Sequence, residues 1–351
     1  YEVTKQGITT EKALQALARA ARCHPRAVRF PARKDRQAVA VQFASIKGNP
    51  PQRLVGEQVS AAHVGRLDRP LRPTDIGANR FAITLRDLSP SEAMTLCDQL
   101  TRMAEHGLPN YFHHQRFGSF SPGDGFLGAR IVARDAEGAL RAYLTCIYPG
   151  DPSAVRSFKR VAAGRWGEWE TLFAAAPQPS NYRSLLTFLR DHPTAYRKAL
   201  NLIPQRTLSL FLAAYQSHLW NLIAGVYLEA LAGEAGTKIA IANTTLPVPD
   251  TLPVDHREKL VTLSIPMPHH RARYDDPVLR EIVNHALAAE GLTQNDLKAR
   301  LLTRAYLSRH GRQLLFFPDE LDLEGPVQDD HFPGRVKMRA AFTLPRGSYA
   351  T

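Results

Sequence analysis

A run of mostly apolar residues from Leu208 to Leu231 constrains the fold of this 351-residue chain more than any other feature. The run is apolar on most faces rather than along one stripe. A helix with that pattern is stable only when other elements surround it. We therefore expect a buried helix here, and we expect Tyr215 and Trp220 to pack in its core at least as readily as they contact a binding partner.

The hydrophobic pattern divides the chain into two kinds of region. Up to about residue 135, strands and helices are mixed: apolar residues alternate with polar or small ones over 39–43 and 81–85, the period of two that buries one face of a sheet. From about 136 to 315 the pattern is mainly helical, and 336–351 indicates a strand and a turn. The length allows two domains.

Several helices are predicted from local signals. The segment 89–107 has capping-box spacing at Ser89 and Glu92, a proline at the first helical position and Gly107 as its end, with a buried stripe of Leu96, Cys97, Leu100 and Met103. Further helices are expected at about 11–22, 277–290 and 294–309. Residues 247–268 are rich in proline and indicate loops with short strands.

Positive charge exceeds negative charge. Lysine and arginine number 45 against 33 acidic residues, a formal net charge of +12, and such a surplus favours polyanions such as RNA. The stretch 19–36 is strongly basic and contains one acid, Asp35. Neighbouring cations favour the ionised form of a carboxylate, so Asp35 is either an ionised group placed where a polyanion is attracted or a structural residue that balances charge or caps a turn.

Cysteine usage and hydropathy exclude several classes of protein. Cys23, Cys97 and Cys146 are widely spaced and form no CxxC pattern, so neither a disulfide framework nor a zinc site is indicated, and a reducing compartment such as the cytoplasm is expected. No stretch approaches the roughly 20 apolar residues that span a bilayer. We expect no metal ion and no membrane segment.

Five motifs follow one another along the chain. Residues 34–42 have the pattern KDRxAxxxQ, 77–86 GxNRFxxxxR, 107–118 GxPNYFxxQRFG, 214–221 AYQSxxWN and 344–351 LPxGSYAT. In this order they resemble the tRNA pseudouridine synthase D family, TruD. Collinear motifs across nearly the whole length are far more specific than any single pattern.

The resemblance implies a fold and a domain organisation. The fold is α+β, a mixed and mostly antiparallel pseudouridine synthase sheet flanked by helices, with an inserted, mainly helical TRUD-type domain. Residues 1–135 and 316–351 are expected to form a discontinuous catalytic domain, and 136–315 the inserted domain. The end of the chain is then expected to return to the sheet that the first 135 residues begin.

The resemblance also implies a chemistry. Uridine becomes pseudouridine when the bond from N1 to the sugar breaks, the base turns and C5 rejoins the sugar, a change that needs no cofactor and no metal. It does need a carboxylate, a pocket for an unstacked base and donors that retain the uracil. Asp35 is the expected catalytic residue, as a nucleophile or as a base at the sugar.

Substrate-binding residues are expected around it. Phe112 is expected to stack on the flipped uracil, with a core phenylalanine as the alternative. Asn110 is expected to address the uracil edge or to fix its loop. The further substrate-binding candidates are Lys34, Gln42, Asn79 and Arg116, although a turn role beside Gly77 is the favoured explanation for Asn79.

The chain departs from the family pattern at three positions. Ala40 stands where threonine is usual, His113 where glycine follows the NYF triplet, and Arg33 where a small or apolar residue precedes the lysine. The family's N-terminal FxVxE motif does not occur before Tyr1, and relatives continue beyond Thr351. We therefore expect both ends of the natural protein to lie outside this sequence.

Three functions are compatible with these features. The leading one is a monomeric, cytoplasmic tRNA pseudouridine synthase that modifies a uridine in the D-stem region, conventionally position 13, with tRNA or another structured RNA as its partner. A non-catalytic RNA-binding protein or RNA chaperone on the same scaffold is the rival, which His113 and Ala40 leave open. An Asp-dependent hydrolase or nuclease is weaker, because no motif supplies a second acid near Asp35.

Overall fold

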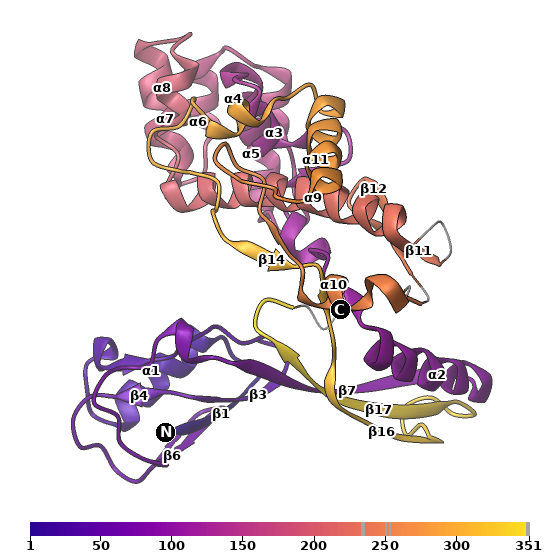
Figure 1. Ribbon diagram of the computed structural model, residues 1–351. Coiled ribbons are helices and arrows are strands. Elements are labelled where there is room, and N and C mark those ends of the chain that lie inside the picture. The colour runs from indigo at the N-terminus through magenta and orange to yellow at the C-terminus, as the bar shows by residue number, and fades with distance from the viewer. Residues whose placement is uncertain (233–235, 250, 253, 349–351) are drawn as a thin grey trace. The chain divides into compact units, whose positions relative to one another are not determined.

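The structure is a computed structural model that describes residues 1–232, 236–249, 251–252 and 254–348 (Figure 1). Contacts divide the chain into two compact units. Unit 1 comprises Tyr1–Phe81 and Thr343–Gly347, and unit 2 comprises Ala82–Phe342 and Ser348–Thr351. These limits describe compactness, so the domain boundaries expected at 135 and 315 stay a prediction.

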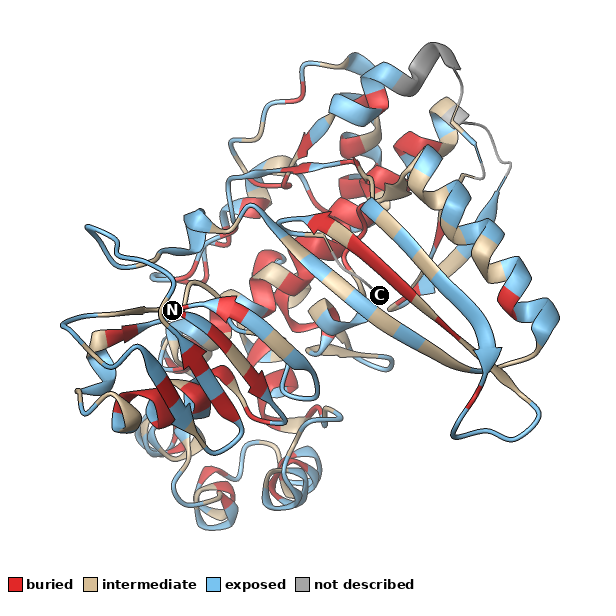
Figure 2. Cartoon of the chain, turned by 90° about the horizontal axis from the view of Figure 1, so that it is seen from below, coloured by how far each residue is buried: buried red, intermediate tan, exposed pale blue. Residues whose placement is uncertain are grey.

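A four-stranded antiparallel sheet is the framework of unit 1. Its strand order is β3-β1-β6-β5, with β1 at Glu2–Gln6, β3 at Val39–Phe43, β5 at Arg53–Gly56 and β6 at Val59–Ala62. Buried and less buried residues alternate along β1 and β6 (Figure 2). Helix α1, Thr10–Ala20, joins the same apolar cluster through Ala13, Ala16 and Leu17. A short pair of strands, β2 at Val28–Arg29 and β4 at Ser45–Ile46, lies beside the 3-10 helix η1 at Pro25–Ala27, and η2 follows at Pro73–Asp75.

Strand β3 forms where the alternation predicted it, but the prediction of its buried face was wrong. Its large apolar residues are exposed: Val39, Val41 and Phe43. The register gives the reason, because Gln42 lies opposite Val3 and Ala40 opposite Lys5. Directly opposed residues share a face, and Val3 and Lys5 are the inward residues of β1.

Helix α9, Gln205–Ala232, confirms the buried helix predicted from the apolar run. Tyr215 and Trp220 are 1% and 0% exposed, so both are core residues. Helices α3, Leu127–Val132, and α11, Pro277–Ala289, pack against α9. A Cβ on Gly128 of α3 would lie 2.4 Å from the Phe211 carbonyl oxygen, so this close approach of α3 to α9 requires glycine.

Shorter helices surround this centre. They are α4 at Ala136–Thr145, α5 at Ser153–Gly164, α6 at Trp169–Ala175, α7 at Asn181–Asp191, α8 at Tyr196–Leu200 and α10 at Val254–Thr262. Leucine and aromatic side chains of α4 to α8 extend the apolar cluster of α9. Helix α10 is a correction, since residues 247–268 were predicted to hold only loops and short strands.

Strands β7, Ala78–Leu88, β16, Asp319–Gln328, and β17, Val336–Pro345, form a three-stranded sheet in the order β16-β17-β7. The last strand of the chain thus lies beside a strand from the first 135 residues, as predicted. The described residues also form two-stranded sheets: β8 at Leu108–Pro109 with β15 at Leu315–Phe316, β9 at Phe120–Ser121 with β10 at Gly125–Phe126, β11 at Thr237–Ile241 with β12 at Thr244–Val248, and β13 at Ser264–Pro266 with β14 at Gly311–Gln313. The α+β class is confirmed.

Helix α2, Pro90–His106, begins and ends as predicted. The Ser89 hydroxyl accepts a hydrogen bond from the Glu92 amide, the Glu92 carboxylate accepts one from the Ser89 amide, and Gly107 ends the helix at φ +77°. The residues of the predicted stripe, Leu96, Cys97, Leu100 and Met103, are only half-buried. Ala93 is the one fully buried residue described in this helix.

The helix predicted at 294–309 was wrong. A 3-10 helix, η4, covers Gln294–Lys298 and ends at Ala299, whose φ is +51°. Beyond it, side chains replace the helical hydrogen bonds: Asn201 donates to the Leu301 carbonyl at 2.8 Å and accepts from the Thr303 amide at 2.9 Å. The leucines that gave the helical spacing are buried in an irregular segment: Leu301, Leu302 and Leu307.

Acid sensitivity is predicted for unit 2 from His218 of α9. Its ring stacks on Phe126 at 4.7 Å, and burial lowers the pKa of His218 below its ordinary value, although Glu290 opposes this shift. The unfolded chain therefore binds this proton more readily than the folded chain, and stability is lost as the pH falls below about 6.5. We expect wild type to lose up to about 1.4 kcal/mol per pH unit more than His218→Leu.

Urea unfolding followed by tryptophan fluorescence measures this difference, because all three tryptophans lie in unit 2. The control is His285→Leu, because His285 is an exposed histidine on α11. Equal acid sensitivity in wild type and His218→Leu would contradict the assignment.

Candidate functional site

The loop between β2 and β3 carries Lys34 and Asp35. The Asp35 side chain is exposed, whereas its backbone carbonyl accepts a hydrogen bond from the Lys5 ammonium. The Lys34 amide donates to the Thr10 hydroxyl at 2.9 Å, and the Arg36 guanidinium lies 3.5 Å from the Gly7 carbonyl. The backbone of this loop is therefore tied to β1 and to the start of α1.

Lys5 is the residue of this region that sequence reasoning missed. Its side chain is 1% exposed, and its Nζ donates to the Ile8 carbonyl at 3.0 Å as well as to Asp35. Burial lowers the pKa of Lys5, and the negative charge of Asp35 opposes that shift. The sequence signal that could have identified Lys5 is its place at an inward position of β1, where an alternating strand usually carries an apolar residue.

Lys34 and Asn79 form a direct hydrogen bond from Nζ to the side-chain oxygen. Burial lowers the pKa of Lys34, and the nearby charge of Asp35 again opposes the shift. Within the part of the chain that the structure describes, no group donates a hydrogen bond to the Asp35 carboxylate. This acid therefore lies close to two ammonium groups with its oxygens available to a substrate.

Gln42 lies on the inward face of β3. It is 8% exposed, and both polar atoms of its amide are buried with no hydrogen-bond partner among the described residues. The structure thus places Gln42 in the interior of unit 1, on the face of the sheet that also carries Lys5.

The segment Asn110–Phe112 is bonded on two sides within unit 2. The backbone N–H of Asn110 donates to the Leu314 carbonyl at 2.8 Å, and the side-chain Nδ2 of Asn110 donates to the Gln313 carbonyl at 3.1 Å. On the other side, Asn221 of α9 accepts from the Phe112 amide at 2.8 Å and donates to the Phe112 carbonyl at 2.9 Å. The sequence placed Asn221 in a family motif but gave it no role.

The Phe112 ring is 5% exposed. It meets Trp220 edge-on at 5.7 Å, and the guanidinium of Arg116 lies 5.4 Å from its centroid. The Arg116 Nε donates to the Ser217 hydroxyl at 3.0 Å. A second guanidinium, that of Arg312, lies 4.0 Å from the same centroid. Phe112 therefore has the surroundings of a packed side chain with cationic neighbours.

Two histidines near this segment, His310 and His113, have lowered pKa values. Burial, with Arg312 and Arg116, lowers the pKa of His310, and burial with His114 lowers the pKa of His113.

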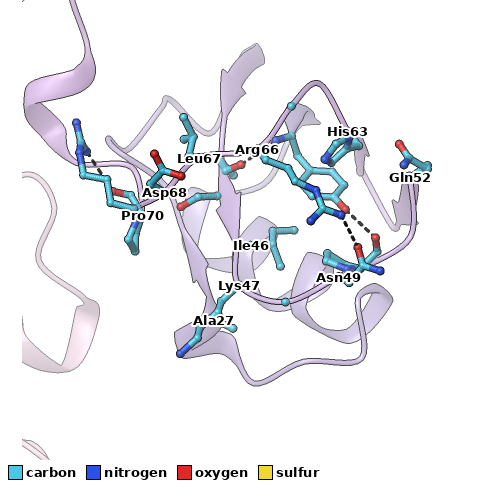
Figure 3. A pocket seen from close by; sticks show the side chains of 17 residues that line it. Ala27, Ile46, Lys47, Asn49, Gln52, His63, Arg66, Leu67, Asp68 and Pro70 are labelled. Atoms are coloured by element: carbon cyan, nitrogen blue, oxygen red, sulfur yellow. Dashed lines mark hydrogen bonds between the residues drawn. The ribbon is translucent and has the colours of Figure 1, made fainter.

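Figure 3 shows a separate pocket of about 450 Å³ in unit 1. Arg66 donates to the Asn49 side chain at 3.1 Å beside His63, and Lys47 and Asp68 add charges of opposite sign. Among the described residues that line it, none belongs to the seven site residues predicted from the sequence. The pocket is therefore distinct from both segments above.

The seven predicted residues fall into two groups. Lys34, Asp35, Gln42 and Asn79 belong to unit 1, where Lys34, Asp35 and Asn79 gather at one loop. Asn110, Phe112 and Arg116 belong to unit 2, where they gather between α9 and β14. Across the described residues, no group of three or more His, Cys, Asp or Glu side chains is arranged to hold a metal ion. Within the described part of the chain, no helix is long and apolar enough to cross a membrane.

Comparisons with known proteins point in one direction. The family model described as tRNA pseudouridine synthase D (TruD) matches residues 1–351. A relative from Methanopyrus kandleri, named "Probable tRNA pseudouridine synthase D", is 30% identical over all of this chain and 83% of its own length. A tRNA pseudouridine synthase D from Leptospira interrogans is 22% identical over all of this chain and 87% of its own length.

A crystal structure from Methanosarcina mazei, titled "Putative tRNA pseudouridine synthase D (TruD)", has a similar fold. Its TM-score is 0.77 at 22% identity, covering all of this chain and 85% of that one. The fold expected from the sequence motifs is therefore confirmed.

We predict that Lys5→Met loosens the Asp35 loop. The variant loses the donor to the Ile8 and Asp35 carbonyls, and a hydrogen bond from a charged group contributes about 1.5–3 kcal/mol. Tryptic cleavage after Arg33, Lys34 and Arg36 under native conditions should rise at least about tenfold. Lys12→Met, at an exposed position of α1, is the control, and an unchanged cleavage rate in Lys5→Met would refute the role.

Proposed function

The chain belongs to the tRNA pseudouridine synthase D family and is accordingly an isomerase, and from this premise we propose that it modifies a uridine in the D-stem region of tRNA, position 13 by convention, with Asp35 as the catalytic carboxylate. The observation that carries the proposal is the arrangement of the loop that contains Asp35. Its backbone is held by Lys5 and Thr10, while its carboxylate is exposed and accepts no hydrogen bond from the described residues.

The reaction places definite demands on this carboxylate. The bond from N1 to C1′ breaks, a bond from C5 to C1′ forms, the hydrogen on C5 leaves as a proton and N1 gains one, so no electrons are exchanged with the surroundings. An ionised carboxylate assists either by attack on C1′ or by removal of a proton from the sugar. The ammonium groups of Lys5 and Lys34 lie near this carboxylate, and their positive charges interact with the negative charge of Asp35.

The remaining residues receive supporting roles in this proposal. Asn110 addresses the edge of the detached uracil, and Phe112 forms an apolar wall against the base. Arg116, held by Ser217, supplies positive charge for the RNA backbone. Lys34 and Asn79 bond to one another, so we propose that they act as a pair that fixes the catalytic loop.

Gln42 is assigned a supporting role beneath the loop rather than a direct contact. Its amide is enclosed on the inward face of β3, and a buried amide that lacks a partner is costly. We expect the Gln42 amide to gain a hydrogen-bond partner when the loop changes its conformation on binding RNA.

We predict that Asp35→Asn lowers the rate of pseudouridine formation by about a thousandfold or more, because the amide is neither a nucleophile nor a base. Binding of tRNA should stay within about threefold, since one exposed acid contributes little to phosphate contacts. The measurement is carbodiimide primer-extension mapping of unmodified tRNA incubated without added cofactor, beside a filter-binding titration.

Asp68→Asn is the matched control, because Asp68 is another exposed acid of unit 1. A mapped site in the D-stem region for wild type and Asp68→Asn, but not for Asp35→Asn, is the expected result. Tight binding without any mapped site would instead favour an RNA-binding protein, and shortening of the RNA would indicate a nuclease.

A further inference from the structure

Arg312 is a buried cation in the middle of β14. The strand pairs with β13, with Arg312 opposite Ile265, and Arg312 points inward between its exposed neighbours Gly311 and Gln313. The whole residue is only 9% exposed. Burying a guanidinium costs several kcal/mol unless hydrogen bonds and aromatic contacts compensate for the lost water, so its contacts indicate what it is for.

The guanidinium contacts each residue of the segment Asn110–Phe112. Nε donates to the Asn110 carbonyl at 2.6 Å, and Nη2 donates to the Asn110 side-chain oxygen at 2.6 Å. Nη2 also lies 3.5 Å from the Tyr111 carbonyl, and the guanidinium carbon is 4.0 Å from the Phe112 ring centroid. One planar group thus holds a backbone carbonyl, a side-chain amide and an aromatic ring.

These contacts determine which way the Asn110 amide points. A guanidinium only donates, so the atom that it meets must be the amide oxygen, and the Gln313 carbonyl only accepts, so the atom that it meets must be the amide nitrogen. The opposite orientation would place donors against donors and acceptors against acceptors. The chemistry of its two partners therefore fixes Asn110 in one state.

The fixed amide keeps part of its hydrogen-bonding capacity. Its oxygen has a second lone pair and its nitrogen a second hydrogen, and in this orientation each lies at a defined position. A uracil edge offers the complementary groups, an N–H between two carbonyl oxygens. An Asn110 side chain that flipped freely would meet the same edge correctly only part of the time.

We infer that Arg312 is a positioning residue that sets the orientation of the Asn110 amide and the place of the Phe112 ring, so that the segment holds the uracil while it turns. The inference rests on the proposed function for its substrate. The clamp itself rests only on contacts within unit 2.

The substitution Arg312→Lys tests this role with little change of charge. An ammonium cannot bond the Asn110 carbonyl and side-chain oxygen in the same plane while lying flat on the Phe112 ring. We expect the single-turnover rate of pseudouridine formation to fall about 10–100-fold in Arg312→Lys, because misplacement of a positioning group by about 1 Å has an effect of that size. Binding of tRNA should change less than about threefold, since the positive charge is retained.

Arg280→Lys is the matched control. Arg280 of α11 also donates to a backbone carbonyl, that of Tyr274 at 3.0 Å, and it lies on a helix rather than on the strand that bonds the Asn110–Phe112 segment. Rates are compared well below each variant's melting temperature, and this control is expected to keep the wild-type rate within about twofold.

A double-mutant cycle separates positioning from general loss of structure. If Arg312 acts through Asn110, then Arg312→Lys lowers the rate by a much smaller factor in an Asn110→Ala background than in wild type. Equal factors in the two backgrounds would overturn the inference. So would a single-turnover rate for Arg312→Lys equal to that of Arg280→Lys.

Hydrogen exchange tests the clamp without reference to activity. Peptides that cover residues 108–118 should exchange at least about tenfold faster in Arg312→Lys than in wild type, whereas peptides from unit 1 should not change. Unchanged exchange across 108–118 would overturn the inference. If exchange across 108–118 is faster in Arg312→Lys but the wild-type protein forms no pseudouridine, the clamp is supported and the proposed function is refuted.

Discussion

Polar side chains on the buried helix α9 must find hydrogen-bond partners inside the protein, and unit 2 is organised around that requirement. Gln216, Ser217 and Asn221 are at most 2% exposed. Gln216 bonds the backbone of Pro268 and Ser308, and Asn221 bonds both backbone groups of Phe112. An apolar helix with a few polar residues thus fixes irregular segments that have no helix or sheet of their own.

The same mechanism explains where sequence reasoning succeeded and where it failed. Long elements with local signals were predicted well: the apolar run gave α9, and the capping box with Gly107 gave both ends of α2. The helix expected at 294–309 failed because Asn201 and Gln216, distant in sequence, take over the backbone hydrogen bonds of that segment. The face of β3 was misjudged because the register with β1, rather than hydrophobicity, decides it.

The candidate site shows a similar division. Sequence motifs that occur in a fixed order along the chain led to Asp35, Asn110 and Phe112 as candidates. The residues that hold them, Lys5 and Arg312, were missed, because each donates to main-chain carbonyls of a segment with no sequence signature for such contacts. In both cases a buried cation bonds the backbone of a candidate site segment, and such pairs become visible only once the fold brings them together.

In the proposed reaction, this chain moves the glycosidic bond of a uridine in tRNA from N1 to C5. The most direct measurement is the release of tritium from tRNA that carries uridine labelled at C5, because the C5 hydrogen must leave as a proton when C5 joins the sugar. We expect release of one tritium per tRNA, with the RNA left at full length and no free uracil formed. Full-length RNA that retains all its tritium after prolonged incubation at stoichiometric protein would contradict it.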